Sequence, residues 1–195
     1  MSDPDALDIA DMQRLCAGHD AALNDIMERH AQALFHYLLR YLHTEADAAD
    51  AAQETFVRVF QHRDKFDQQR KFSTWLYTIA TNLARNRLKW QSRHPQVSLE
   101  QTTGDDERTL ADTLPDPRQS PDAQALGEER THSIRAAVNR LPQQLREPLL
   151  LAEYEDRSAE EISAILNCSR KAVETRIYRA RQLLREWLEP VLTRD

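Results

Sequence analysis

Five cations crowd one short stretch near the C-terminal end of a 195-residue chain, LNCSRKAVETRIYRAR, residues 166–181. Residues 169–185 hold six basic side chains and a single acidic one, Glu174. Cations at this density bind polyanions, because phosphate contacts depend on local charge, and here the whole chain has a formal net charge of -6. The stretch therefore predicts a nucleic-acid contact, with a merely solvated helix face as the alternative.

A second basic segment spans residues 58–93, where nine side chains are basic and two are acidic. Part of it mixes an aromatic ring with amides and cations on one side of an expected helix: Trp75, Thr78, Asn82, Arg85, Asn86 and Lys89. Aromatic rings stack on unpaired bases, amides read base edges, and cations hold phosphates, so this mixture suits single-stranded nucleic acid. The alternative is a half-buried tryptophan beside a solvated polar face.

Residue types needed for other chemistry are scattered. The seven histidines follow no metal-ligand or catalytic spacing, Cys16 and Cys168 stand far apart, and the three glycines form no phosphate-binding loop. No apolar run reaches the roughly 20 residues of a membrane span. We expect a cytoplasmic protein with reduced thiols, no cofactor, no metal and no enzyme activity.

The composition favours an all-α fold of two small domains, because 41% of residues are hydrophobic, 30% are charged and only three are glycine. Residues 94–129 hold nine acidic and two basic side chains and four of the eight prolines. We therefore expect an N-terminal helical domain at 1–92, an acidic flexible linker at 93–127, and a C-terminal helix-turn-helix domain at 128–195.

Apolar spacing outlines the N-terminal helices. Positions 34, 35, 38 and 42 share one face, and a helix after Thr44 has an apolar stripe from Ala48 to Phe60. Its opposite face is either solvated or binds a partner, and carries Asp50, Gln53, Glu54 and Val57. Ser73 is expected to cap the helix that bears the mixed face.

In the C-terminal half, Pro148 should kink its helix or mark the helix's beginning. Ser158 and Glu161 form a capping box, and Asn167 suits a left-handed turn before a final helix that Ser169 caps. In that helix Val173, Ile177, Ala180, Leu184 and Leu188 repeat at helical spacing and define the buried face. The cations and Glu174 remain outside, as in a helix that enters the major groove.

Taken together, DAADAAQETFVRVFQHRDKF, RKFSTWLYTIATNLARNRLK and LPQQLREPLLLAEYEDRSAEEISAILNCSRKAVETRIYRARQLLRE resemble a bacterial sigma factor of the extracytoplasmic-function class. The resemblance covers about residues 10–92 and 128–188. It implies a non-catalytic, dissociable subunit of RNA polymerase that recognises promoters and helps to open them, with an anti-sigma factor as a further partner.

The resemblance also implies site residues. Asp50, Gln53, Glu54 and Val57 would bind the clamp helices of the largest polymerase subunit, while the C-terminal domain would bind the flap tip. The non-template strand of the minus-ten element would contact Lys65, Phe66, Arg70, Lys71, Phe72, Trp75, Thr78, Asn82, Arg85, Asn86 and Lys89. The duplex minus-thirty-five element would contact Arg170, Lys171, Glu174, Thr175, Arg176, Tyr178 and Arg179.

The chain departs from the family pattern at two places. Thr78 and Ile79 stand where primary sigma factors have paired tryptophans, which implies opening that relies on capturing few bases. Glu174 stands where a cation is frequent, so the promoter sequence cannot be transferred from other members. A helix-turn-helix regulator that acts without polymerase stays open as an alternative, although it leaves the first basic segment unexplained.

Overall fold

The computed structural model describes the backbone of residues 4–94 and 121–192, and the side chains of residues 5–94 and 130–189. Every regular element in these ranges is a helix, which confirms the all-α prediction. None of the described helices is long and apolar enough to cross a membrane.

The N-terminal half consists of α1 (Pro4–Cys16), α2 (Ala22–Leu42), α3 (Glu45–Gln61), the 3-10 turn η1 (Arg63–Lys65) and α4 (Phe72–Arg93). The expected apolar faces are confirmed, since Leu34 and Leu38 of α2 and Phe56 and Val59 of α3 are buried. Thr44 caps α3 by accepting a hydrogen bond from the amide of Asp47 at 3.3 Å.

One expected cap is wrong. The helix α4 begins at Phe72, and Lys71 is its N-cap residue without a side-chain cap bond. Ser73 is buried instead, and its hydroxyl accepts a hydrogen bond from Arg157 Nη1 of the C-terminal half at 2.8 Å. The Ser73 hydroxyl, which the sequence suggested for local capping, is therefore hydrogen-bonded to a guanidinium distant in the sequence.

The C-terminal half consists of α5 (Pro121–Arg140), α6 (Gln143–Glu153), α7 (Ala159–Leu166) and α8 (Arg170–Leu192). Pro148 lies inside α6 and does not begin it. The α5 helix starts within the segment expected to be linker, and the part of that segment at residues 95–120 lies outside the described residues.

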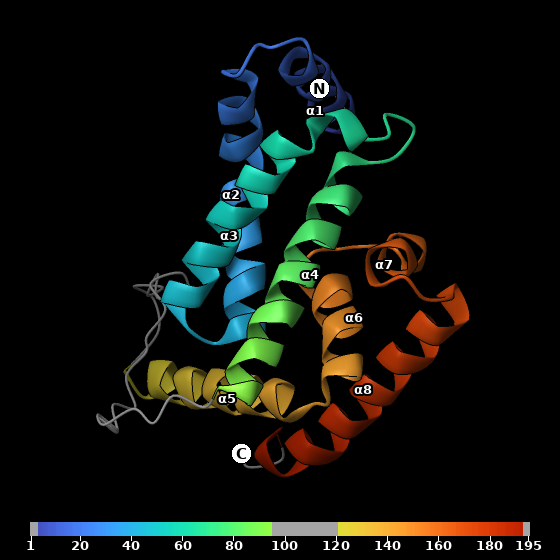
Figure 1. The fold of residues 1–195 in the computed structure, drawn as a ribbon. Helices are drawn as coiled ribbons and strands as arrows, with labels where there is room; N and C mark the ends of the chain where they lie inside the picture. The colour runs from blue at the N-terminus through green and yellow to red at the C-terminus, as the bar shows by residue number, and fades with distance from the viewer. Residues whose placement is uncertain (1–3, 95–120, 193–195) are drawn as a thin grey trace.

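The two halves pack against each other around α4, which runs through the middle of the molecule (Figure 1). A single hydrophobic cluster contains Leu34 and Tyr77 from the first half together with Leu150, Ile162 and Val173 from the second. All five side chains are almost completely buried. Removing such apolar surface from water is the main driving force for the contact between the halves.

Candidate nucleic-acid and polymerase interfaces

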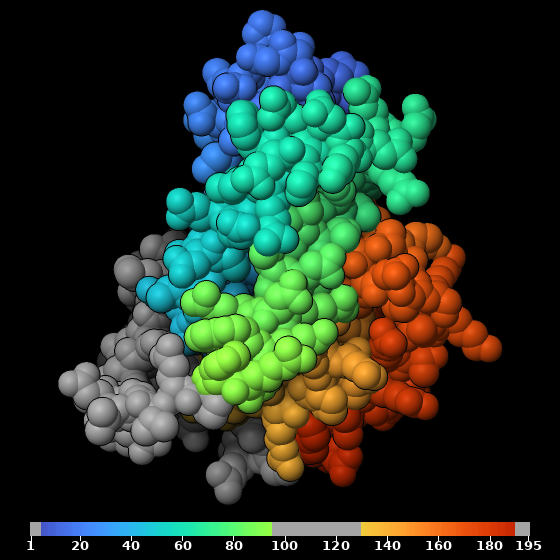
Figure 2. Space-filling view, in the orientation of Figure 1, coloured from blue at the N-terminus to red at the C-terminus, as the bar shows by residue number. Residues whose placement is uncertain are grey.

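The face of α3 predicted to bind polymerase is open to solvent. Its four predicted residues are exposed and border a shallow groove between α3 and α4: Asp50, Gln53, Glu54 and Val57. Figure 2 shows these two helices side by side on one face of the molecule, with the C-terminal helices against the far flank of α4. Val57 keeps 40% of its surface exposed in an otherwise acidic setting. This arrangement suits a partner that combines basic and apolar side chains.

An ion pair fixes the floor of this groove. Arg87 of α4 donates from Nε to Asp47 Oδ1 at 2.8 Å, and its Nη2 lies 3.8 Å from Asp50 Oδ2. Hydrogen bonds from Thr44, Arg87 and Gln91 outweigh the effect of burial, which acts in the opposite direction, and lower the pKa of Asp47. Arg87 could not be predicted from the sequence, because its partner lies on another helix and no local spacing indicates it.

Helix α4 displays only part of its predicted strand-binding set. Asn82, Asn86 and Lys89 are exposed, whereas Trp75, Thr78 and Arg85 are partly buried. The Thr78 hydroxyl donates to the carbonyl of Thr74 at 2.7 Å. The amides and Lys89 are therefore available to a ligand without rearrangement.

The loop before α4 combines exposed cations with buried rings. Lys65, Arg70 and Lys71 are exposed, but Phe66 and Phe72 are only 9% and 0% exposed. The two phenylalanine rings lie 5.8 Å apart, and both contact the ring of Trp75. The structure thus gives Phe66 and Phe72 a supporting position beneath the loop.

Arg85, predicted to hold DNA, is engaged by the other half of the chain. Its Nε and Nη2 donate to Glu147 Oε1 and Oε2 at 2.9 and 2.6 Å. Tyr41 also donates to this carboxylate, as does Gln143 Nε2 at 2.8 Å. Burial raises the pKa of Glu147, but these donors outweigh it and the pKa lies below its ordinary value. Glu147 is therefore a buried anion held mainly by donors from α2 and α4.

Lys71 has a similar contact at the far end of α4. Its Nζ lies 3.3 Å from Glu161 Oε1, and the other oxygen of Glu161 accepts the capping bond from the amide of Ser158 at 2.8 Å. Between these two ion pairs, Tyr77 donates to Glu155 and Arg157 stacks 4.9 Å from the Tyr77 ring centre. Two of the cations predicted to bind the minus-ten strand, Arg85 and Lys71, thus form ion pairs with carboxylates of the C-terminal half.

The turn between α7 and α8 follows the expectation. Ser158 and Glu161 form a reciprocal capping box, and Asn167 adopts the left-handed conformation with φ 50° and ψ 55°. The hydroxyl of Ser169 accepts from the amide of Ala172 at 3.2 Å and so caps α8. Val173 and Ala180 are fully buried, which confirms the predicted inner face.

The outer face of α8 presents the predicted duplex-reading residues. Arg170, Lys171, Glu174, Thr175, Tyr178 and Arg179 are exposed, and Arg176 is partly buried. Arg170 donates from Nε to Glu174 Oε1 at 2.8 Å and also contacts Glu160 of α7. Glu174 therefore orients a neighbouring cation besides being a candidate for base contact.

Comparisons with known proteins agree with this arrangement. The family described as Sigma-70 region 2 matches residues 26–94, and the family described as Sigma-70, region 4 matches residues 131–184. The RNA polymerase sigma-H factor of Pseudomonas aeruginosa is 30% identical over 93% of this chain and 93% of the relative. The ECF RNA polymerase sigma factor SigW of Bacillus subtilis is 33% identical over 88% of this chain and 91% of the relative.

Solved structures are similar as well. CnrH, solved in complex with the cytosolic domain of CnrY, is 26% identical with a TM-score of 0.69, covering 94% of this chain and 98% of that chain. RpoE from Bartonella quintana is 22% identical with a TM-score of 0.66, and supports the fold alone. The two family matches and the near full-length relatives show that this chain belongs to the extracytoplasmic-function class of bacterial RNA polymerase sigma factors.

Proposed function

We propose that this sigma factor divides its three contacts among three surfaces. The α3 face bordering the groove binds the largest subunit of core RNA polymerase, the loop at residues 65–72 and the exposed side of α4 capture the non-template minus-ten strand, and the outer face of α8 reads the minus-thirty-five duplex. The chain itself performs no catalysis; the polymerase does.

The observation that carries the proposal is the exposed α3 face, where Val57 places an apolar side chain among acidic ones. A polymerase-independent regulator has no need for an acidic groove remote from the helix-turn-helix. Burying an exposed apolar side chain against a partner removes its surface from water and so contributes to binding, and the flanking carboxylates favour a partner with basic side chains.

The strand-capturing surface retains Lys65, Arg70, Asn82, Asn86 and Lys89 as direct contacts, because these side chains are exposed. We assign Phe66 and Phe72 to support of the loop, and Trp75 to its edge. Arg85 and Lys71 join the contact set after they leave Glu147 and Glu161. Capturing unpaired bases offsets the free energy needed to open the duplex.

One substitution tests the polymerase contact. In Val57→Asp, a carboxylate would have to lose water in the interface, and the affinity for core polymerase should fall on the order of thirtyfold, the effect of losing about 2 kcal/mol of binding free energy. Met27→Asp is the matched control, because Met27 is an exposed apolar residue of α2 outside the groove.

The readouts are affinity for core polymerase and promoter-dependent transcription with purified components. Val57→Asp should lose both while its binding to minus-thirty-five duplex DNA stays unchanged. If the wild-type chain bound promoter duplex but gave no transcripts with core polymerase, the regulator reading would replace this one.

A protein partner that holds the factor inactive is also part of the proposal. The similar CnrH was solved together with the cytosolic domain of a second protein, CnrY. We propose that an anti-sigma factor of this kind binds the present chain.

A further inference from the structure

The N-terminal helix α1 contacts the strand-capturing loop, residues 65–72, at two points, and contacts the turn η1 that leads into this loop at a third. Cys16 Sγ donates to the carbonyl of Arg63 at 3.4 Å, Gln13 Nε2 donates to Gln68 Oε1 at 2.9 Å, and Asp5 Oδ2 lies 3.5 Å from Lys71 Nζ. These contacts reach η1 just before the loop, the middle of the loop and its end. The matched family region starts at residue 26, so α1 lies outside it.

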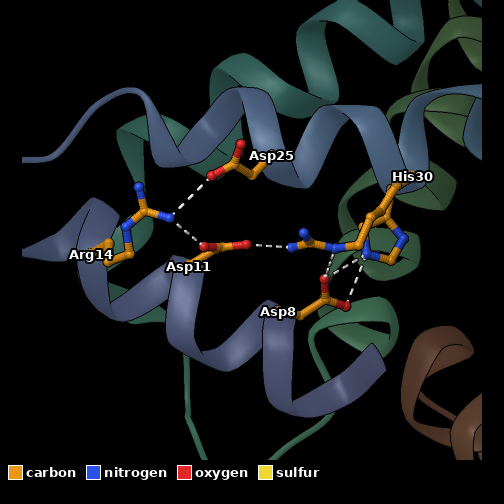
Figure 3. Close-up of polar contacts among 6 residues, drawn as sticks. Asp8, Asp11, Arg14, Asp25 and His30 are labelled. Atoms are coloured by element: carbon orange, nitrogen blue, oxygen red, sulfur yellow. Dashed lines mark hydrogen bonds and ion pairs between the residues drawn. The ribbon is translucent and has the colours of Figure 1, made fainter. Parts of the chain in front are cut away.

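Directional polar contacts fix α1 on α2. Figure 3 shows Asp8 and Asp11 of α1 facing side chains of α2, with Arg14 joining Asp11 to Asp25. Asp8 accepts from Arg29 Nε at 3.0 Å and lies 2.8 Å from His30 Nε2. Asp11 accepts from Arg29 Nη2 at 2.6 Å.

Burial makes this network specific in orientation. Asp8 is 1% exposed and Asp11 is 7% exposed, while the fully buried apolar side chains of α1 are only Met12 and Leu15 among its described residues. Two such residues allow a helix to slide or rotate with little loss of apolar contact. Two buried carboxylates that share one guanidinium permit a single register, because any shift leaves a buried charge without its partner.

The same network reaches the base of the loop. The His30 ring, which contacts Asp8, lies 5.3 Å from the ring of Phe72. Phe72 in turn packs against Phe66 and Trp75, the rings beneath the loop. The position of α1 and the support of the loop therefore depend on one connected set of contacts.

The loop has little structure of its own between Phe66 and Lys71. Arg70 donates its amide to the Asp67 carbonyl at 2.9 Å, and Gln69 donates its amide to the Asp67 side chain at 3.0 Å. Both are local bonds that fix a turn but not its position on the protein. The position of the turn therefore depends on contacts beyond these bonds: those with α1, the packing of Phe66 and, at Lys71, the ion pair with Glu161 of the C-terminal half.

We propose that α1 positions the strand-capturing loop, with Asp8 as the positioning residue, and so contributes to selectivity for the minus-ten bases. This inference rests on the proposed function of the loop. A pocket for an extruded base discriminates only if its walls stay in place, since a loose pocket accepts wrong bases at small cost. Loss of the contacts between α1 and the loop should therefore reduce discrimination between minus-ten bases more than the affinity for polymerase.

The test measures transcription by core polymerase with the full chain on promoters that carry each base at each minus-ten position. Asp8→Asn keeps the side-chain shape but removes the charge. Gln13→Ala removes the exposed contact with Gln68, and Asp5→Asn weakens the partly exposed ion pair with Lys71. Asp25→Asn is the matched carboxyl-to-amide control at the outer end of the network. We expect Asp8→Asn and the Gln13→Ala, Asp5→Asn double variant to lower the ratio between best and worst base by about five- to thirtyfold.

Core affinity and minus-thirty-five duplex affinity should stay unchanged in all variants. If the wild type is selective and the double variant retains its ratio, α1 is not a positioning element, whatever the stability of Asp8→Asn. An equal loss of selectivity in Asp25→Asn would overturn the proposal in favour of a general charge effect. A wild type without any minus-ten selectivity would instead overturn the assignment of the loop, and the proposal with it.

Discussion

Replacing Glu147 with glutamine should separate the two halves of the free chain. The carboxylate belongs to α6, and its main donors, Arg85 and Tyr41, belong to the other half. The Glu147 side chain is 4% exposed and that of Arg85 25% exposed, so Glu147→Gln leaves a largely buried guanidinium without an anion. Breaking one partner of a buried pair costs about 3–5 kcal/mol. We take the lower end, since Arg85 retains some access to water.

About 3 kcal/mol corresponds to roughly a hundredfold shift of the equilibrium between closed and separated halves. It acts on the contact between the halves, because Arg85 and Tyr41 keep their places in the N-terminal core. Separation also frees Arg85 and Lys71 for phosphate. Binding of a single-stranded minus-ten oligonucleotide to the free chain should therefore tighten, as judged by fluorescence anisotropy, while the radius of gyration from small-angle scattering increases.

The matched control is Glu153→Gln on the same helix, where the carboxylate pairs with Arg181 of its own half and both side chains are well exposed. It should change neither the radius of gyration nor the oligonucleotide affinity. If Glu147→Gln left both quantities at their wild-type values, the Arg85 contact would not hold the halves together, and the reasoning from its burial would be refuted.

Three further predictions concern single positions. Burial raises the pKa of Glu155 despite the hydrogen bond from Tyr77, so its ionised form opposes the closed state and Glu155→Gln should favour closure at neutral pH. The stability that Glu155 contributes should fall as the pH rises from 4.5 to its raised pKa, whereas the contribution of Glu147 is lost as the pH falls below 4.5. Circular dichroism melts across this pH range measure both effects. Glu174→Arg should change base preference at one position of the minus-thirty-five element, and an unchanged preference in a promoter-library selection would contradict it. Because Asn167 has a φ of 50°, Asn167→Gly should leave stability nearly unchanged in denaturant titrations whereas Asn167→Ala costs about 1 kcal/mol, and equal effects of the two would show that the left-handed turn is not the reason.

Local patterns in the sequence were sufficient to predict the geometry of the helix-turn-helix. The Ser158 and Glu161 capping box, the left-handed Asn167 and the buried Val173 depend on residues within a few positions of one another. Their geometry follows from helical periodicity and backbone sterics. Both are properties of short segments, and the structure confirms each of them.

Contacts between the halves were beyond the reach of such patterns. Ser73 has the residue type and place of a helix cap, yet its partner Arg157 lies 84 positions away. Arg85 has the type and place of a DNA-binding cation, yet it pairs with Glu147, 62 positions away. A serine or an arginine has the same local preferences with or without a distant partner, so only the packed chain reveals which one it has.

The closed arrangement gives the proposed contacts an order. The α3 face and the outer face of α8 are exposed while the halves are packed together. Under the proposed function, polymerase and duplex DNA can therefore bind before the halves separate. Arg85 is held by Glu147, so under the proposed function it reaches the single strand only after the halves separate, which also releases Lys71 from Glu161. Because a ligand shifts an equilibrium only through its different affinity for the two states, polymerase favours separation if it holds the two halves apart. Strand capture would then be strongest where polymerase is already bound, which is where an opened promoter is useful.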